Sequence, residues 1–180
     1  MLKKILSVSL GLFALCIVVV LGMALTQPDE LRVERHTSIA APPEVVFGFI
    51  NDLHRFTEWS PWQKRDPLMT TAFEGPASGV DASYSWKGND SVGEGRLTIT
   101  ESQFETKVAM RLEFLKPFEV TNQVEFSVTP AADGTRVTWA MTGKNDFTSK
   151  VMAVFIDMEQ MIGKDFEAGL ADLKKLAESA

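Results

Sequence analysis

The pattern of apolar and polar positions changes sharply near residue 26. Residues 5–25 run for 21 positions without a charged side chain, and Lys3 and Lys4 come just before them. A helix rises about 1.5 Å per residue, so this run covers roughly 30 Å, the thickness of the hydrocarbon core of a bilayer. The pattern predicts one membrane-spanning anchor. Lysines on its N-terminal side favour a cytoplasmic N-terminus, with the rest of the chain on the far, periplasmic or extracellular side.

A cleaved signal peptide is the main alternative at this end of the chain. The apolar stretch of a signal peptide is usually about 7–15 residues, which is shorter than this run. The best small-residue cleavage pattern, Gly22-Met23-Ala24, is weak. A lipoprotein signal at Cys16 fits less well, because the bulky Leu15 precedes the cysteine. We therefore expect residues 1–25 to be an anchor or an uncleaved signal.

Beyond a polar linker over residues 26–30, the periodicity predicts one domain over residues 31–178. Alternation and turn residues predict strands over 31–40, 69–73, 82–86, 95–100, 106–115, 119–129 and 135–142. Helical spacing predicts two short helices, over 43–50 and 53–58, and one long helix over 149–178. This order indicates an α+β domain with its helices packed on one side of a curved antiparallel sheet.

Composition narrows the class of function. The chain has 18 Lys and Arg against 24 Asp and Glu, a net charge of −6, which argues against nucleic acid as a partner because phosphates need a basic face. The single cysteine, Cys16, lies in the apolar run, so the domain has neither a disulfide nor a thiol nucleophile. The chain has only two histidines, His36 and His54, which excludes most metal sites built on several imidazoles. We therefore predict no metal and no cofactor.

Four segments together resemble a known superfamily. They are Ile39–Phe47 (IAAPPEVVF), Trp59-Ser60-Pro61-Trp62 followed by Asp66-Pro67, Gly93-Glu94-Gly95, and the hairpin Asp133–Trp139 (DGTRVTW). In this order they resemble the START/SRPBCC superfamily, in its polyketide cyclase/dehydrase-like bacterial branch, over about residues 31–178. The resemblance implies a helix-grip fold, in which a sheet of six to seven strands wraps around a long C-terminal helix. It also implies an internal cavity for a hydrophobic small molecule such as a lipid, a polyketide or an aromatic metabolite.

Aromatic and methionine side chains are the candidate lining of such a cavity. The candidates are Trp59, Trp62, Tyr84, Trp86, Phe114, Trp139, Met141, Phe155, Met158 and Met161. The alternative for each is that it simply fills the core. Asn122 shares a strand face with Val124 and Phe126, where a polar group needs a partner, either a ligand or a backbone group or water. Arg96 is a candidate to bind a ligand carboxylate or phosphate, or else to lie in solvent.

Catalytic groups are sparse. His54, Tyr84, Arg96 and Asp157 are the candidates for acid–base chemistry, and nothing in the sequence brings His54 and Asp157 together. We assign no catalytic residue. The sequence thus predicts a membrane-tethered domain that binds a hydrophobic small molecule without chemistry. Two alternatives stay open: a cyclase- or dehydratase-type enzyme acting on such a ligand, and an envelope protein-interaction module with a filled cavity.

Overall fold

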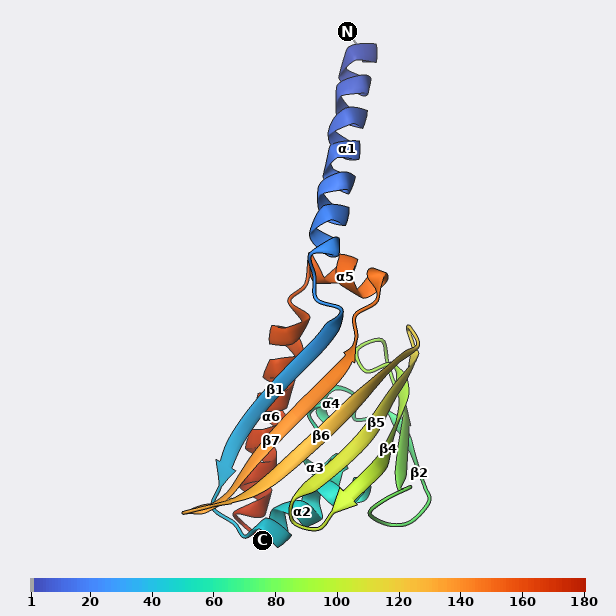
Figure 1. The fold of residues 1–180 in the computed structure, drawn as a ribbon. Helices are drawn as coiled ribbons and strands as arrows, with labels where there is room; N and C mark the ends of the chain where they lie inside the picture. Colours follow the sequence, from blue (N-terminus) through green and yellow to red (C-terminus); the bar gives the residue numbers. More distant parts are fainter. Residues whose placement is uncertain (1) are drawn as a thin grey trace. The chain divides into compact units, whose positions relative to one another are not determined.

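The chain forms two compact units. The computed structural model describes the backbone of residues 2–180 and the side chains of residues 9–180. One unit combines Met1–Leu31 with Lys144–Met158, and the other combines Arg32–Gly143 with Glu159–Ala180 (Figure 1). We call them the N-terminal unit and the sheet unit.

The N-terminal unit is built from helices α1 (Leu2–Leu25) and α5 (Phe147–Ala153), which contact each other. The segment between α1 and the first strand is held in place by residues that lie much later in the sequence. The side-chain amide of Asn145 donates to the carbonyl oxygen of Pro28 (2.9 Å), and Lys150 forms an ion pair with Asp29. These contacts join two stretches of chain that are more than a hundred residues apart in sequence.

The prediction of a membrane anchor is wrong. Among the residues that the structure describes, no helix is both long enough and apolar enough to span a membrane. The prediction rested on a count of uncharged positions over residues 5–25. Such a count does not test whether one helix combines the length and the apolar character that about 30 Å of hydrocarbon demands. The placement of the domain on the far side of a membrane depended on that anchor, so it is withdrawn too.

The sheet unit contains the predicted strands, joined in one seven-stranded sheet. The strands are β1 (Glu30–Ile39), β2 (Thr70–Glu74), β3 (Ser83–Lys87), β4 (Glu94–Gln103), β5 (Lys107–Lys116), β6 (Val120–Ala131) and β7 (Gly134–Lys144). Their order across the sheet is β1-β7-β6-β5-β4-β3-β2, and the pairs from β2 to β7 are antiparallel. The first strand therefore lies at one edge beside the last, and β2 forms the other edge. The predicted α+β class and its curved antiparallel sheet are confirmed.

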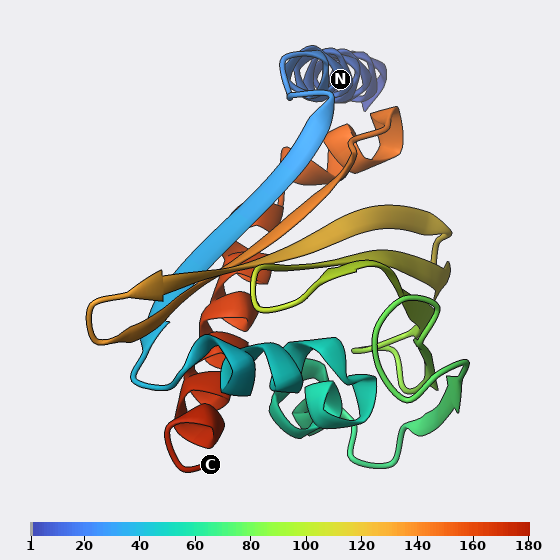
Figure 2. The same ribbon diagram turned by 60° about the horizontal axis from the view of Figure 1, so that its bottom comes forward.

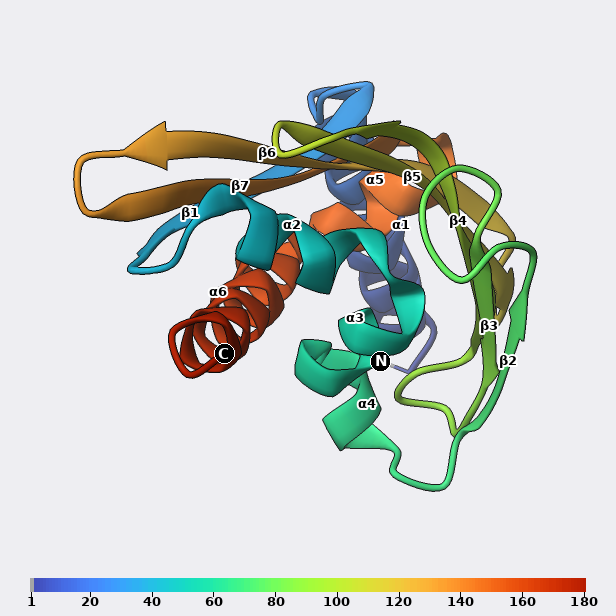
Figure 3. The ribbon, with the colours of Figure 1, turned by 90° about the horizontal axis from the view of Figure 1, so that it is seen from below.

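The helices of the sheet unit, α2 (Pro43–Asn51), α3 (Leu53–Trp59), α4 (Pro61–Arg65) and α6 (Met158–Ala177), cover one face of the sheet (Figure 2). Pro43 and Pro61 occupy first turns, where a missing N–H costs nothing. The Asp52 side chain accepts from the backbone N–H of His54 and so begins α3. Seen from below, α6 lies under the β1–β7 end, and α3 and α4 lie between α6 and the β2–β3 edge (Figure 3).

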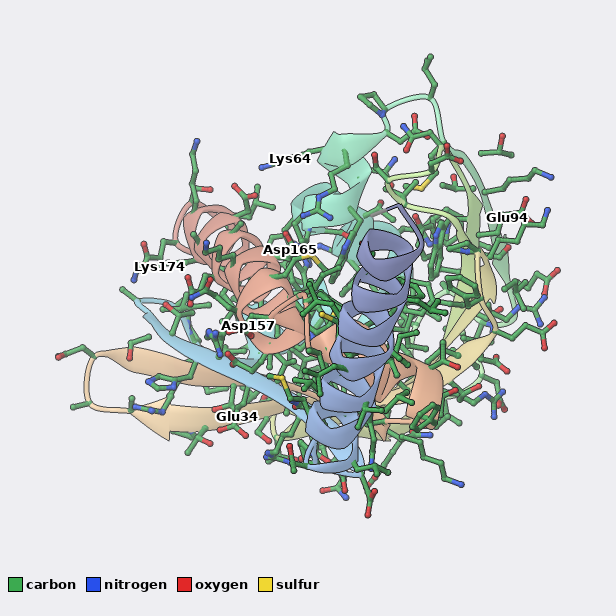
Figure 4. The ribbon with its side chains drawn as sticks, turned by 90° about the horizontal axis from the view of Figure 1, so that it is seen from above. Glu34, Lys64, Glu94, Asp157, Asp165 and Lys174 are labelled. Atoms are coloured by element: carbon green, nitrogen blue, oxygen red, sulfur yellow. The ribbon has the colours of Figure 1, made fainter. Side chains whose placement is uncertain are left out.

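The single long helix predicted over 149–178 is instead two helices, α5 and α6, separated by residues 154–157. Residues 151–156 are apolar at every position, so they have no one-sided stripe that would continue the amphipathic face of α6. Asp157 comes directly before α6 (Figure 4), and Asp is a preferred residue at the position before a helix. A new helix therefore begins there.

Two glycines in α6 let the helix pack closely against its neighbours. A Cβ atom at Gly169 would lie 2.9 Å from Cζ3 of Trp139 and 3.1 Å from Cδ of Pro61. A Cβ atom at Gly163 would lie 2.0 Å from the guanidinium of Arg35. Both glycines are buried, so the space that a larger residue would need is already filled.

Arg35 fastens β1 to α6 across Gly163. Its Nη1 lies 2.6 Å from Glu159 Oε1 and its Nε lies 2.7 Å from Glu167 Oε1. The two glutamates stand one turn before and one turn after the glycine, so the guanidinium rests between them. These hydrogen bonds raise the pKa of Arg35 above its ordinary value. Arg35 thus shares the face of Val33 and Ile39, and its role here is structural.

Candidate functional site

The face of the sheet that packs against the helices, here called the inner face, is closed at one end and thinly covered at the other. On β5 the side chains of the inner face are Val108, Met110, Leu112 and Phe114. This confirms the alternation of apolar and polar positions predicted for this strand. Val108 and Met110 are fully buried, whereas Leu112 and Phe114 are only half-buried. The change falls within one regular strand, so it reflects what covers the strand and not a break in it.

Four neighbouring inner-face residues form what we call the open strip: Trp86, Leu112, Phe114 and Asn122. Leu112 is paired with Asn122 across β5 and β6. Phe114 and Trp86 both pair with Gly95 of β4, from opposite sides. The rings of Trp86 and Phe114 meet edge to face, with centroids 5.9 Å apart. The strip is therefore a continuous apolar surface with one polar residue at its β6 edge.

Glycines on the inner face shape this strip. A Cβ atom at Gly95 would lie 2.4 Å from Cζ2 of Trp86, so the glycine is what lets the indole lie across β4. A Cβ atom at Gly143 would lie 1.9 Å from Oδ1 of Asn122. Asn122 pairs with Gly143 across β6 and β7, so its amide lies over the bare backbone of β7.

Asn122 is the polar residue of the strip. It is 7 % exposed and sits on the same face as Val124 and Phe126, as the sequence predicted. Within the described part of the chain its side-chain amide makes no hydrogen bond with another residue. A buried amide normally has a partner, so this group is available to one that the protein itself does not supply.

Tyr84 extends the aromatic surface from the strip toward α4. Its ring lies 5.8 Å from that of Trp86, and its hydroxyl donates to Oε1 of Gln63 (3.3 Å). Burial raises the pKa of Tyr84 to about 12, because the charged phenolate is poorly solvated there. At neutral pH the hydroxyl is therefore protonated and acts as a donor.

Trp139 of β7 lies at the centre of the core beside the strip. Its ring stacks on Phe166 of α6 at 4.0 Å and 8°, and it meets the rings of Trp59 and Trp62 edge to face at 5.5 and 5.8 Å. Trp139 is 2 % exposed, and its Nε1 has no hydrogen-bond partner among the described residues. A buried donor left unsatisfied costs about 1–3 kcal/mol.

Helix α4, which supplies Trp62, is joined to α6 by two ion pairs. Lys64 pairs with Asp172, and Arg65 pairs with Asp165. Lys64 and Asp165 lie on facing sides of the two helices (Figure 4). The lysine and arginine are well exposed, so the pairs set the position of α4 with little contribution to stability.

Most of the predicted lining residues come together on the inner face, but several do not. Trp59, Tyr84, Trp139 and Met141 are buried there or against it, and Trp62 is half-buried. Met161 is 47 % exposed, and Phe155 is 71 % exposed. Phe155 and the half-buried Met158 belong to the N-terminal unit.

The polar candidates outside the strip also have other surroundings. Arg96 lies on the outer face of β4, because its neighbours Gly95 and Leu97 are the buried ones, and its Nη2 is 3.4 Å from Glu74. His54 is mostly exposed and stacks on Phe73 at 3.8 Å. Asp157 belongs to the N-terminal unit.

Leu112, Gly143 and Gln63 were not among the predicted site residues. The clean alternation of β5 was the signal for Leu112, since it placed this residue on the same face as Phe114. The glycine and the glutamine had no comparable signal. In the described part of the chain, no group of three or more His, Cys, Asp and Glu residues could hold a metal ion.

The class of protein follows from this architecture. A seven-stranded antiparallel sheet curved over a C-terminal helix, with short helices after the first strand and an apolar inner face, is the helix-grip fold of the START/SRPBCC superfamily. The family model described as "Polyketide cyclase / dehydrase and lipid transport" matches residues 30–178, and the chain belongs to this family. The family indicates a role in binding or converting a hydrophobic small molecule. A search of the curated proteins finds no match.

Solved structures share the fold at low sequence identity. CV1439 from Chromobacterium violaceum is 15 % identical with a TM-score of 0.60, over 84 % of this chain and 99 % of that one. MLL2253 from Mesorhizobium loti is 16 % identical with a TM-score of 0.61, over 83 % and 98 %. The di-domain ARO/CYC StfQ from the steffimycin biosynthetic pathway is 11 % identical with a TM-score of 0.60, over 83 % of this chain and 51 % of that one. At these identities the likeness concerns the fold alone.

Proposed function

We propose that the sheet unit binds a hydrophobic small molecule along the open strip, without chemistry. The observation that carries the proposal is the change in burial along β5, from Met110 at 0 % exposure to the half-buried Leu112 and Phe114. A strand that is sealed by helices at one end and leaves large apolar side chains uncovered at the other offers a surface for an apolar ligand.

The character of the strip supports a small apolar ligand with a directional polar contact. The aromatic faces of Trp86 and Phe114 suit a flat or extended apolar body. Apolar burial contributes roughly 25 cal/mol per Å², so covering about 200 Å² contributes about 5 kcal/mol before the costs of association. The amide of Asn122 would fix the orientation, as placed polar groups do in apolar pockets.

The surroundings of the titratable candidates favour binding over catalysis. His54 is mostly exposed, Arg96 lies on the outer face, and Asp157 belongs to the N-terminal unit. Among these candidates Tyr84 is the one whose ring contacts the strip, and its raised pKa keeps its hydroxyl neutral at neutral pH. These four candidates therefore include no group in the strip that is poised to accept a proton at neutral pH.

The test uses two substitutions at adjacent positions of β5 that differ in exposure. The full-length chain is titrated with N-phenyl-1-naphthylamine, a neutral apolar probe whose fluorescence rises on burial. Phe114→Gln places a polar group in the strip and is expected to weaken probe binding at least tenfold. Leu115→Gln, at a residue that is 54 % exposed, is the control and is expected to leave probe binding unchanged.

Native extraction of the same protein for small-molecule mass spectrometry identifies a ligand that co-purifies. Equal probe binding by both variants would mean that the open strip is not the site at which the probe binds. Failure of the unaltered chain to bind any apolar probe would overturn the proposal as a whole.

A further inference from the structure

We propose that Trp139 is a specificity-determining residue of this site, whose Nε1–H donates a hydrogen bond to an oxygen atom of the bound ligand. The inference rests on the proposed function and deepens it. The ligand would then be an apolar molecule that bears a carbonyl or hydroxyl oxygen, and not a pure hydrocarbon.

Two of the other three indoles, those of Trp59 and Trp86, provide a comparison. Nε1 of Trp59 donates to the carbonyl oxygen of Phe49 at 3.0 Å, and Nε1 of Trp86 donates to that of Val92 at 3.0 Å. These two indole N–H groups therefore have backbone carbonyls as their acceptors. Trp139, buried to the same degree as Trp59, has no such acceptor among the described residues.

The surroundings of Trp139 disfavour a water molecule as the missing partner. A buried water needs two to four polar partners. The ring is packed by aromatic side chains: Phe56, Trp59, Trp62, Phe126 and Phe166. An oxygen atom carried by an apolar ligand suits these surroundings. The apolar part of the ligand replaces contacts with the aromatic side chains, and the oxygen accepts the hydrogen bond from Nε1.

The position of the indole also suits a ligand that enters along the strip. Its Cζ3 edge faces Gly169 of α6, and Nε1 is on the opposite side of the ring system, so the N–H points away from this glycine. Trp139 lies four residues before Gly143 on β7, about 13 Å along the strand. Met141 lies between them on the same face and is 4 % exposed, so a ligand that reaches Trp139 from the strip has to displace this flexible side chain.

The experiment compares two ligands of nearly equal shape, 2-acetylnaphthalene and 2-ethylnaphthalene, which differ in a carbonyl oxygen. The unaltered full-length chain is expected to prefer the acetyl compound by roughly 3- to 10-fold, the range for one net hydrogen bond. Trp139→Phe keeps an aromatic ring but removes the N–H, and is expected to abolish the preference while still binding the ethyl compound. Phe104→Leu, at a residue that is 71 % exposed and lies outside the strip and the Trp139 cluster, is the control and is expected to keep it.

A second measurement holds even where Trp139→Phe folds poorly. The chain has four tryptophans, so ¹⁵N labelling of their indoles gives four N–H signals. Single Trp→Phe variants of the other three tryptophans assign their signals, and the remaining signal is that of Trp139. The Trp139 signal is expected to move downfield with 2-acetylnaphthalene and not with 2-ethylnaphthalene.

The outcomes separate the two proposals. Binding of both compounds with equal affinity, and no downfield shift of the Trp139 signal, would overturn the role of Trp139 and leave the open strip as a binding site. Binding of neither compound would overturn the proposed function itself.

Discussion

Replacing Phe166 by alanine tests whether the stack between α6 and the sheet holds the sheet unit together. Phe166 is 1 % exposed and lies 4.0 Å from the ring of Trp139 in a nearly parallel stack. It also meets the ring of Trp62 of α4 edge to face at 6.4 Å. Truncation therefore removes the aromatic group through which α6 contacts both β7 and α4.

The expected loss follows from the depth of burial. Phe→Ala in a core costs about 3–5 kcal/mol, since transfer free energy is lost and a cavity remains. Stacked aromatic pairs contribute about 0.5–1.5 kcal/mol beyond their area, which places Phe166→Ala toward the upper part of that range. For a domain of this size each kcal/mol lowers Tm by about 2–4 °C, so a loss of about 4–5 kcal/mol is expected to lower Tm by about 8–20 °C.

The assay is urea unfolding of the full-length chain, followed by far-ultraviolet circular dichroism and by tryptophan fluorescence. Phe118→Ala is the matched control, because this phenylalanine is 64 % exposed and its truncation is expected to cost under about 0.5 kcal/mol. Equal unfolding free energies for the two variants would refute the reasoning that the stack is central to the core.

Two further predictions concern the polar groups near the strip. Gly143→Ala is expected to destabilise by about 1–3 kcal/mol, because its Cβ would collide with Oδ1 of Asn122. Asn122→Ala in the same chain should relieve this cost, giving a coupling above about 0.5 kcal/mol in a double-mutant cycle, and strictly additive effects would contradict the contact. The single tyrosine, Tyr84, is expected to titrate near pH 12 by absorbance at 295 nm. Since an unfolded tyrosine ionises near pH 10, stability should fall as pH rises from about 10 to about 12. Tyr84→Phe should remove that fall, and a midpoint near pH 10 in the folded chain would argue against burial.

Much of the fold could be predicted because strands and amphipathic helices follow from the local spacing of apolar residues along the chain. Val108 to Phe114 alternate without interruption, and the structure places them on one face as expected. The same reasoning could not find the irregularity between Ile99 and Glu101 in β4, which breaks the register with β5. Beyond it Ser102 donates to Asn51 of α2 at 2.8 Å, a contact that no local pattern indicates.

The candidate site was less predictable because it depends on partners far apart in the chain. Arg35 of β1, for example, has ion-pair partners that are 124 and 132 residues away in the sequence. A run of apolar residues also does not indicate, by itself, which surroundings it has in the folded protein. Residues 5–25 were predicted to be a membrane anchor, and residues 151–156 were predicted to continue one helix. The structure bears out neither prediction.

The open strip owes its shape to where the chain places glycine. At the closed end of the inner face, β4 and β7 present Ile99 and Trp139, which fill the space under the helices. Nearer the strip the same two strands present Gly95 and Gly143, which add no volume to the inner face. The neighbouring side chains of Trp86 and Asn122 lie across them. The regular backbone of β7 therefore serves both a packed core and a surface for a ligand, and the change between the two comes from side-chain size at alternate positions of the strand.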